Sequence, residues 1–204
     1  MKSEHGPLGC APDKSGAALI LLDLINTFDF PGGDRLLRQA VPAAQKIAGL
    51  KQRCRTHGIP AIYVNDHFGR WRSDFSALVE HCRQPEFAGR DVVEMVLPEE
   101  EDYFVFKPMY SGFYQTTLEL LLHHLGSHSL IITGLASNIC VLCTANDAHM
   151  RGYDLWLPGD AMAASTQEEQ VYAELHFQKV LSAQITASEH IPVQRMARPK
   201  SSSE

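Results

Sequence analysis

Three polar residues stand at or just beyond the ends of three apolar runs, and they are a carboxylate, an ammonium and a thiol. Asp23 follows ALILL, Lys107 follows DYFVF, and Cys140 lies in the segment LASNIC that follows LIITG. A free thiol has a pKa of about 8.5, so only a few per cent of it is thiolate at neutral pH. A neighbouring cation stabilises the thiolate, and a carboxylate can accept the thiol proton and return it to a leaving group. The combination predicts acyl transfer by a cysteine nucleophile.

The segments that carry these residues alternate between strand and helix patterns. Strands are expected at Ala17–Asp23, Pro60–Asn65, Asp102–Lys107, Ser129–Gly134, Tyr153–Pro158 and Ile185–Ser188. Helices are expected from Asp34 toward Gly58 and over Ala77–Cys82, Thr116–Leu125, Ile139–Arg151 and Thr166–Leu181. Apolar strands separated by helices are typical of a parallel sheet covered on both faces, with reactive groups at the carboxyl ends of its strands. We therefore predict a three-layer α/β/α sandwich of Rossmann-like topology, with an open, mostly parallel six-stranded sheet.

The length of 204 residues indicates one domain. We assign it to residues 17–194, after a flexible N-terminal segment (1–16) and before a disordered tail (195–204). The formal net charge of −6 gives no general attraction for nucleic acid or an anionic membrane. Five cysteines, an odd number at irregular spacing, favour reduced thiols, and we find no signal-peptide or membrane-span pattern. A cytoplasmic protein is therefore expected.

Cys140 stands near the start of a predicted helix, where unpaired N–H groups and the helix dipole favour negative charge. We expect this position and Lys107 to lower the pKa of the thiol. The backbone N–H groups of Ala136 and Cys140 are the candidates for an oxyanion hole. In the predicted reaction Cys140 attacks a carbonyl, and Asp23 protonates the leaving group and later activates water.

Six further residues are candidates for substrate binding: Asn26, Phe28, Asp66, Trp71, Tyr110 and Phe113. Asn26 either positions Asp23 or the substrate, or it caps a turn, and Phe28 is expected to wall the pocket. Asp66 and Trp71 belong to a cluster that forms a pocket rim, a subunit contact or a solvated loop. Tyr110 and Phe113 either line the pocket or pack in the core.

Cys140 and Cys143 form a C-x-x-C pattern, which is typical of redox dithiols when it starts a helix. The two residues between the cysteines are bulky and apolar, and a redox function leaves Asp23 and Lys107 unexplained. A zinc site with His149 lacks a second pair at ligand spacing. A thiol-redox protein and a non-catalytic binding protein remain the alternatives to a hydrolase.

The segments LLDLINTF, FKPMYSGFYQTTLELLL and LIITGLASNICVLCTANDAHMRGYDLWLPGDA resemble the isochorismatase-like cysteine hydrolases in the same order. This superfamily includes nicotinamidase, N-carbamoylsarcosine amidohydrolase and isochorismatase, and the resemblance covers roughly residues 17–164. It implies a catalytic triad of Asp23, Lys107 and Cys140 that cleaves a carbon–nitrogen bond through a thioester acyl-enzyme. It also implies a cis peptide between Leu135 and Ala136, and a homodimer or homotetramer in which a neighbouring chain completes the pocket.

Two departures from the family pattern refine these expectations. Nicotinamidases carry a metal site of the form Asp-x-His, but here the sequence runs Asp66-His67-Phe68, and His81 is a poor substitute. We therefore expect no metal and no cofactor beside the small-molecule substrate. True isochorismatase uses a variant of this site that lacks the cysteine, so Cys140 favours an amide or ureido substrate over a vinyl ether, which stays the alternative.

Overall fold

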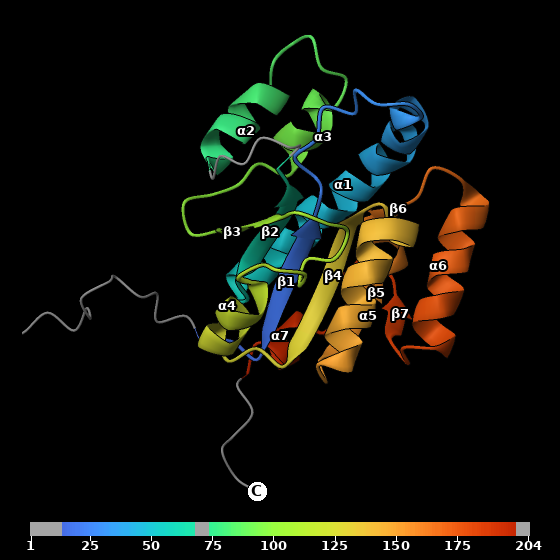
Figure 1. Cartoon of the computed structure of the whole chain (residues 1–204). Coiled ribbons are helices and arrows are strands. Elements are labelled where there is room, and N and C mark those ends of the chain that lie inside the picture. The colour runs from blue at the N-terminus through green and yellow to red at the C-terminus, as the bar shows by residue number, and fades with distance from the viewer. Residues whose placement is uncertain (1–13, 68–73, 199–204) are drawn as a thin grey trace, which may run out of the picture.

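The protein forms a parallel β-sheet between two layers of helices (Figure 1). The computed structural model describes residues 14–67 and 74–198. The strands are β1 (Ala17–Leu22), β2 (Ala61–Asp66), β3 (Tyr103–Lys107), β4 (Ser129–Leu135), β5 (Asp154–Pro158), β6 (Met162–Ala163) and β7 (Gln184–Thr186). Their order is β3-β2-β1-β4-β5-β7, and the short β6 pairs with the end of β4. The predicted fold class is confirmed, with seven strands instead of six because β6 adds one.

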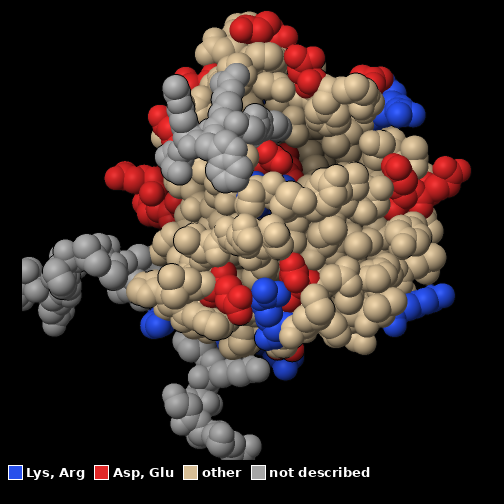
Figure 2. All heavy atoms as spheres, in the orientation of Figure 1, with Lys and Arg blue, Asp and Glu red and all other residues tan. Residues whose placement is uncertain are grey.

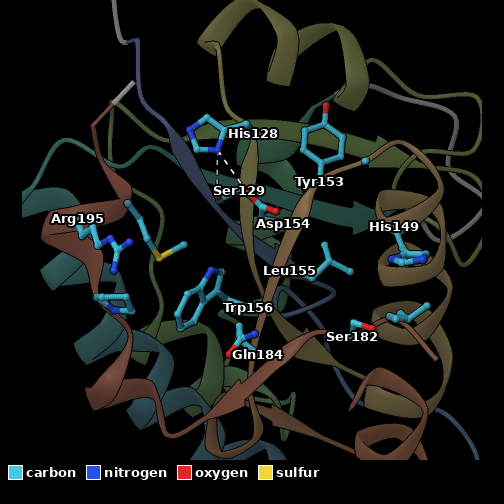
Figure 3. A pocket seen from close by; sticks show the side chains of 14 residues that line it. His128, Ser129, His149, Tyr153, Asp154, Leu155, Trp156, Ser182, Gln184 and Arg195 are labelled. Carbon is cyan, nitrogen blue, oxygen red and sulfur yellow. Dashed lines mark hydrogen bonds and ion pairs between the residues drawn. The ribbon is translucent and has the colours of Figure 1, made fainter. Parts of the chain in front are cut away.

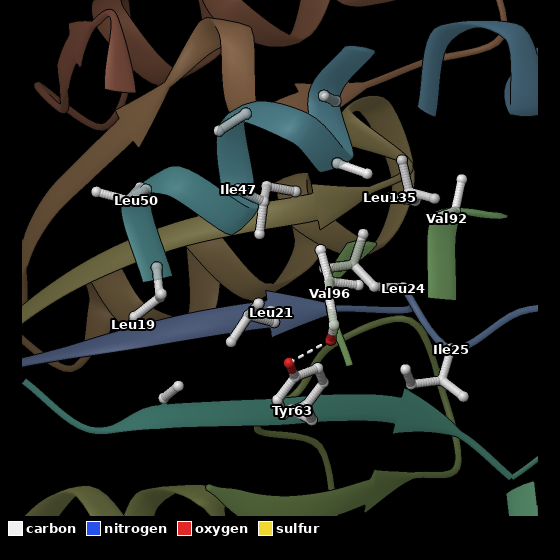
Figure 4. Packing of buried hydrophobic residues seen from close by; sticks show 14 of the residues in the cluster. Leu19, Leu21, Leu24, Ile25, Ile47, Leu50, Tyr63, Val92, Val96 and Leu135 are labelled. Carbon is white, nitrogen blue, oxygen red and sulfur yellow. Dashed lines mark hydrogen bonds between the residues drawn. The ribbon is translucent and has the colours of Figure 1, made fainter. Parts of the chain in front are cut away.

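Strand β1 shows why the sheet needs helices on both faces. All six of its residues are buried, and they alternate between two hydrophobic clusters. Leu19 and Leu21 pack with Ile47 and Leu50 of α1 (Gly33–Thr56), as Figure 4 shows. Residues 18, 20 and 22 face the other cluster. Burying one such leucine or isoleucine stabilises the fold by about 1.5–3 kcal/mol, which makes this strand the centre of the core.

The remaining helices divide between the same two faces. The cluster on the α1 side also takes apolar residues from α2 (Phe75–Cys82), α3 (Arg90–Met95) and α7 (Val193–Met196). The opposite cluster takes them from α4 (Leu118–Leu125), α5 (Leu142–Met150) and α6 (Gln167–Lys179). Within the part of the chain that is described, no helix is both long and apolar enough to cross a bilayer.

The boundaries predicted for the two flexible ends are wrong by a few residues. Ser15 is buried, its N–H donates to the carbonyl of Leu125 (3.0 Å), and its own carbonyl accepts from the Ser127 hydroxyl (3.0 Å). At the other end, Arg195 and Met196 belong to α7, and Met196 packs in the core on the α1 side. Hydrogen bonds and apolar burial therefore hold residues that composition alone assigned to the tails. Residues 1–13 and 199–204 lie outside the described chain.

Candidate active site

The ends of β1, β3 and β4 bring together the three residues that the sequence singled out. Asp23 follows β1 directly and has a left-handed backbone (φ 51°), and Lys107 is the last residue of β3. The Lys107 ammonium lies 2.8 Å from Asp23 Oδ2 and 3.5 Å from Cys140 Sγ. The other Asp23 oxygen, Oδ1, accepts the N–H of Asp66 at 2.9 Å. Both carboxylate oxygens therefore have a partner, which fixes the plane of the carboxylate.

Lys107 is a buried ammonium with three acceptors. Its side chain is 1% exposed, and besides Asp23 and Cys140 it donates to the carbonyl of Met109 at 3.3 Å. Burial alone lowers the pKa of Lys107, but the charge and hydrogen bond of the Asp23 carboxylate, with smaller contributions from Cys140 and Asp66, outweigh it, so the pKa is raised. The side chain therefore stays charged and acts on its neighbours through that charge.

The pKa of the Cys140 thiol is shifted in the opposite direction from the one that the sequence predicts. Burial raises the pKa of Cys140 above its usual value, and the charge and hydrogen bond of Asp23 raise it further; Lys107 lowers it by less. The prediction of a lowered thiol pKa is wrong, because it considered the cation and the helix end but not burial or the carboxylate. The raised pKa favours the neutral thiol of Cys140, which lies beside the Asp23 carboxylate.

Cys140 lies in a π-helical turn, η1 (Ser137–Val141), that runs into α5. The peptide between Leu135 and Ala136 is cis, as the family resemblance implied. Gly134 precedes it with φ 112°, and a Cβ there would lie 2.2 Å from the carbonyl oxygen of Leu22. Only glycine lets β4 approach the end of β1 this closely, and this approach brings the turn of Cys140 (η1) next to Asp23.

The candidate residues near Asp23 shape the backbone. The Asn26 side-chain oxygen accepts the N–H of Phe28 at 2.7 Å, which is the turn-capping alternative of the sequence analysis. Phe28 is buried and stacks on Phe30, with ring centroids 6.4 Å apart. Asn65 was missed: its side chain bonds both the N–H (3.3 Å) and the carbonyl (2.8 Å) of Ile25 and so holds the segment after Asp23. The available signal was its position as the polar residue that ends the predicted strand Pro60–Asn65, as Asp23 and Lys107 end theirs.

The remaining described candidates for substrate binding lie at the end of β2 and on the segment after β3. Asp66 ends β2 opposite Lys107 in the strand register, and its charge contributes to raising the pKa of Lys107. Tyr110 is 60% exposed on the segment after β3. Phe113 is buried in the core 6.0 Å from the Tyr153 ring, which is the core-packing alternative. Trp71 lies outside the described residues.

A residue of α6 also holds the turn that contains Cys140. The buried hydroxyl of Ser137 donates to Gln170 Oε1 at 2.6 Å, and Gln170 Nε2 donates to Glu174 at 2.7 Å. This contact was not predicted, because Gln170 is 33 residues away on a different helix.

Among residues 14–67 and 74–198, no three or more His, Cys, Asp or Glu side chains are grouped as metal ligands. A hollow of about 680 Å³ lies at the amino ends of β4 and β5, where His128 Nδ1 is 3.0 Å from the Ser129 hydroxyl (Figure 3). It is separated from Cys140 by the length of β4, roughly 20 Å at about 3.3 Å per residue. Its lining residues therefore have no part in the chemistry around Asp23.

The fold and the site define the class: an α/β protein with a cysteine, a carboxylate and an ammonium gathered at the carboxyl edge of a parallel sheet. The isochorismatase domain model matches residues 17–189, and the chain belongs to the isochorismatase family of hydrolases.

Individual relatives agree with this assignment. The uncharacterized isochorismatase family protein YaaI of Bacillus subtilis is 39% identical over 178 residues, which is 87% of this chain and 97% of that protein. Enterobactin synthase component B of Escherichia coli is 31% identical over 161 residues, 76% of this chain but only 55% of that protein. The crystal structure of N-carbamoylsarcosine amidase from Thermoplasma acidophilum is similar with a TM-score of 0.66 at 26% identity, over 86% of this chain and 98% of that one.

Proposed function

We propose that this protein is a cysteine hydrolase that cleaves the carbon–nitrogen bond of a small amide or ureido compound, other than a peptide, through a thioester. The observation that carries the proposal is the placement of one buried ammonium 2.8 Å from a carboxylate and 3.5 Å from a partly exposed thiol. These are a base, a cation and a nucleophile in mutual contact, which is what acyl transfer requires. The similarity to an N-carbamoylsarcosine amidase supports the choice of bond.

In the first step Cys140 Sγ attacks the substrate carbonyl. Because the thiol pKa is raised, the proton leaves as the carbon–sulfur bond forms, and Asp23 accepts it. The N–H groups of Ala136 and Cys140 stabilise the oxyanion of the tetrahedral intermediate. Asp23 then passes the proton to the nitrogen of the leaving group, the carbon–nitrogen bond breaks, and a thioester remains on Cys140.

In the second step water attacks the thioester carbonyl. Asp23 accepts a proton from that water, the carbon–sulfur bond breaks, and the proton returns to the sulfur. The products are a carboxylic or carbamic acid and an amine or ammonia. Lys107 stays charged throughout and offsets the negative charge that moves between Asp23 and Cys140. The proposed chemistry uses neither metal nor cofactor.

The exposed surface beside the site supports an oligomer. Figure 2 shows a face on which uncharged residues predominate. Large apolar side chains are exposed on the β3–α4 segment, on α4 and on the turn of Cys140, and they include Met109, Tyr110, Tyr114, Leu120 and Ile139. We propose a homodimer or homotetramer whose neighbouring chain covers this surface, including the exposed Tyr110, and completes the substrate pocket. The four described cysteines are free, which fits the proposed cytoplasmic location.

The test is release of amine or ammonia from a panel of small amides and ureido compounds. Cys140→Ala should abolish release, whereas the matched variant Cys143→Ala should retain most of it. A brief incubation followed by acid quenching should give an intact mass increased by the acyl group, and hydroxylamine should remove that group. Full turnover by Cys140→Ala would refute the proposal. Turnover of a vinyl ether with no amide cleaved would favour the alternative reaction.

A further inference from the structure

One stripe of the helix that carries Cys140 contacts the segment that carries Lys107. The stripe consists of residues 140, 144, 147 and 151, whose spacing of three and four places them on one helical face. Four contacts join it to residues 107–113: Lys107 Nζ to Cys140 Sγ (3.5 Å), the Gly112 N–H to Thr144 Oγ1 (2.9 Å), the Ser111 hydroxyl to Asp147 Oδ2, and the Phe113 ring under the Arg151 guanidinium (4.8 Å to the centroid). The segment after β3 therefore lies along the helix, contact by contact.

The contact at Thr144 is buried and tight. Thr144 and Gly112 are both buried, and a Cβ on Gly112 would lie 3.0 Å from Val64 Cγ1 and 3.4 Å from Thr144 Cγ2. The segment approaches the helix this closely because position 112 is glycine. If Thr144 lost its acceptor oxygen, the Gly112 N–H would be buried without this partner, and the segment would shift to reach another.

Asp147 makes the second contact with the same segment. Its Oδ2 accepts the Ser111 hydroxyl, while its Oδ1 pairs with Arg151 at 3.1 Å. The Ser111 oxygen also accepts the N–H of Phe113 at 3.1 Å. Asp147 therefore holds the turn between Ser111 and Phe113, next to the peptide that Thr144 holds.

The segment that Thr144 and Asp147 hold also contacts the Lys107 ammonium, through the carbonyl of Met109. Met109 stands between Lys107 and Ser111, and its carbonyl accepts the Lys107 ammonium at 3.3 Å. We propose that Thr144 and Asp147 are positioning residues: by fixing the segment that contains Met109, they set the distance between the Lys107 ammonium and the Cys140 sulfur. The helix thus carries the nucleophile at its start and controls the position of the cation from its following turns. For its effect on turnover, but not on thiol reactivity, this inference rests on the proposed function.

The test compares Thr144→Val, which keeps the shape but loses the acceptor, with Thr144→Ser, which keeps the acceptor. Thr133→Val is the matched control, because Thr133 is equally buried and bonds the carbonyl of Ile20 (2.9 Å) inside the sheet. The readouts are the rate of Cys140 alkylation by iodoacetamide at fixed pH, located by peptide mass, and kcat and KM separately. Circular dichroism verifies folding.

Thr144→Val should slow alkylation about tenfold, as expected when the cation moves away and the thiol pKa rises by about one unit. It should lower kcat with little change in KM, whereas Thr144→Ser and Thr133→Val should stay close to the wild type in both. If Thr144→Val folds and alkylates at the wild-type rate, the inference is overturned. If that variant does not fold, Ser111→Ala replaces it, because it removes the hydroxyl that contacts Asp147. Slower alkylation of Cys140 in Ser111→Ala would then support the inference, and the wild-type rate would overturn it. Slower alkylation in a protein that hydrolyses no amide would support the inference and reject the proposed function.

Discussion

The two charges beside Cys140 act on its thiol in opposite directions, and each can be removed separately. Asp23 raises the pKa of Cys140, and Lys107 lowers it. Asp23→Asn keeps the shape of the side chain and removes the negative charge, so the thiol pKa should fall. Lys107→Met removes the positive charge, so the thiol pKa should rise. Both variants should lose turnover, because one lacks the base and the other the cation.

The size of the effect follows from the distance. At 3.5 Å and an effective dielectric constant of about 20, the ammonium and a thiolate attract each other by about 5 kcal/mol, equivalent to some 3–4 pKa units. This is a ceiling, because Asp23 lies 2.8 Å from the same ammonium and water enters the space that Lys107 leaves. A shift of at least one unit, and therefore a change of about tenfold in thiolate, is expected in each direction.

The assay is alkylation of Cys140 by iodoacetamide at pH 8 in a Cys143→Ser background, with peptide mapping to assign the modified cysteine. Asp23→Asn should react faster than the parent and Lys107→Met more slowly. The result for Asp23→Asn is the stricter test, because this variant should have a more reactive thiol and yet a lower turnover than the parent. If Asp23→Asn reacted more slowly, Asp23 would not be raising the thiol pKa, and the assignment of Asp23 as the base acting on a neutral thiol would be refuted.

Three further predictions concern the same region. Asp23→Asn and Lys107→Met should each lower the free energy of unfolding in urea by about 3–5 kcal/mol, because one buried charge loses its partner. The double variant should lose less than the sum of the two single losses, and additive losses would show that Asp23 and Lys107 do not stabilise each other. Gly134→Ala should cost about 3 kcal/mol or more, because its Cβ would meet the Leu22 carbonyl at a positive φ, and a wild-type melting temperature would contradict this. Cys54 is fully buried in the core, out of reach of a reagent, and burial also raises its pKa to about 12, whereas Cys140 is partly exposed. In the folded protein Cys54 should therefore resist iodoacetamide at pH 8 and react only after urea is added; rapid labelling of the folded protein would contradict its burial.

The sequence predicted those parts of the structure that depend on local patterns. The apolar runs placed β1 and β4 to within one residue, and the polar residues at the strand ends identified Asp23, Lys107 and the turn of Cys140. The short elements α3, β6 and α7 were not predicted, since segments of two to six residues carry too little periodicity. Their apolar residues are nevertheless part of the core.

The contacts that position the site could not be predicted, because they join distant parts of the chain. Ser111 and Asp147 are 36 residues apart, and Ser137 and Gln170 are 33 apart. Nothing in either local pattern indicates the partner. The thiol pKa was mispredicted for the same reason: the residues that bury Cys140 come from several elements, and their combined effect exceeds that of the cation that the sequence made visible.

The raised thiol pKa also bears on the choice between acyl transfer and redox chemistry. A redox dithiol at a helix start reacts through a thiolate whose pKa is lowered by its surroundings. Here the pKa of both cysteines of the C-x-x-C pattern is raised: that of Cys140 by burial and Asp23, and that of Cys143 by burial and Asp147. Such a pair attacks a disulfide poorly at neutral pH. A neutral thiol next to a carboxylate is suited instead to a reaction in which the carboxylate takes the thiol proton and then gives it to a leaving nitrogen. The thiol proton is useful there, because the leaving nitrogen must be protonated before it departs. The charges around Cys140 therefore fit the proposed hydrolysis of a carbon–nitrogen bond better than they fit thiol exchange.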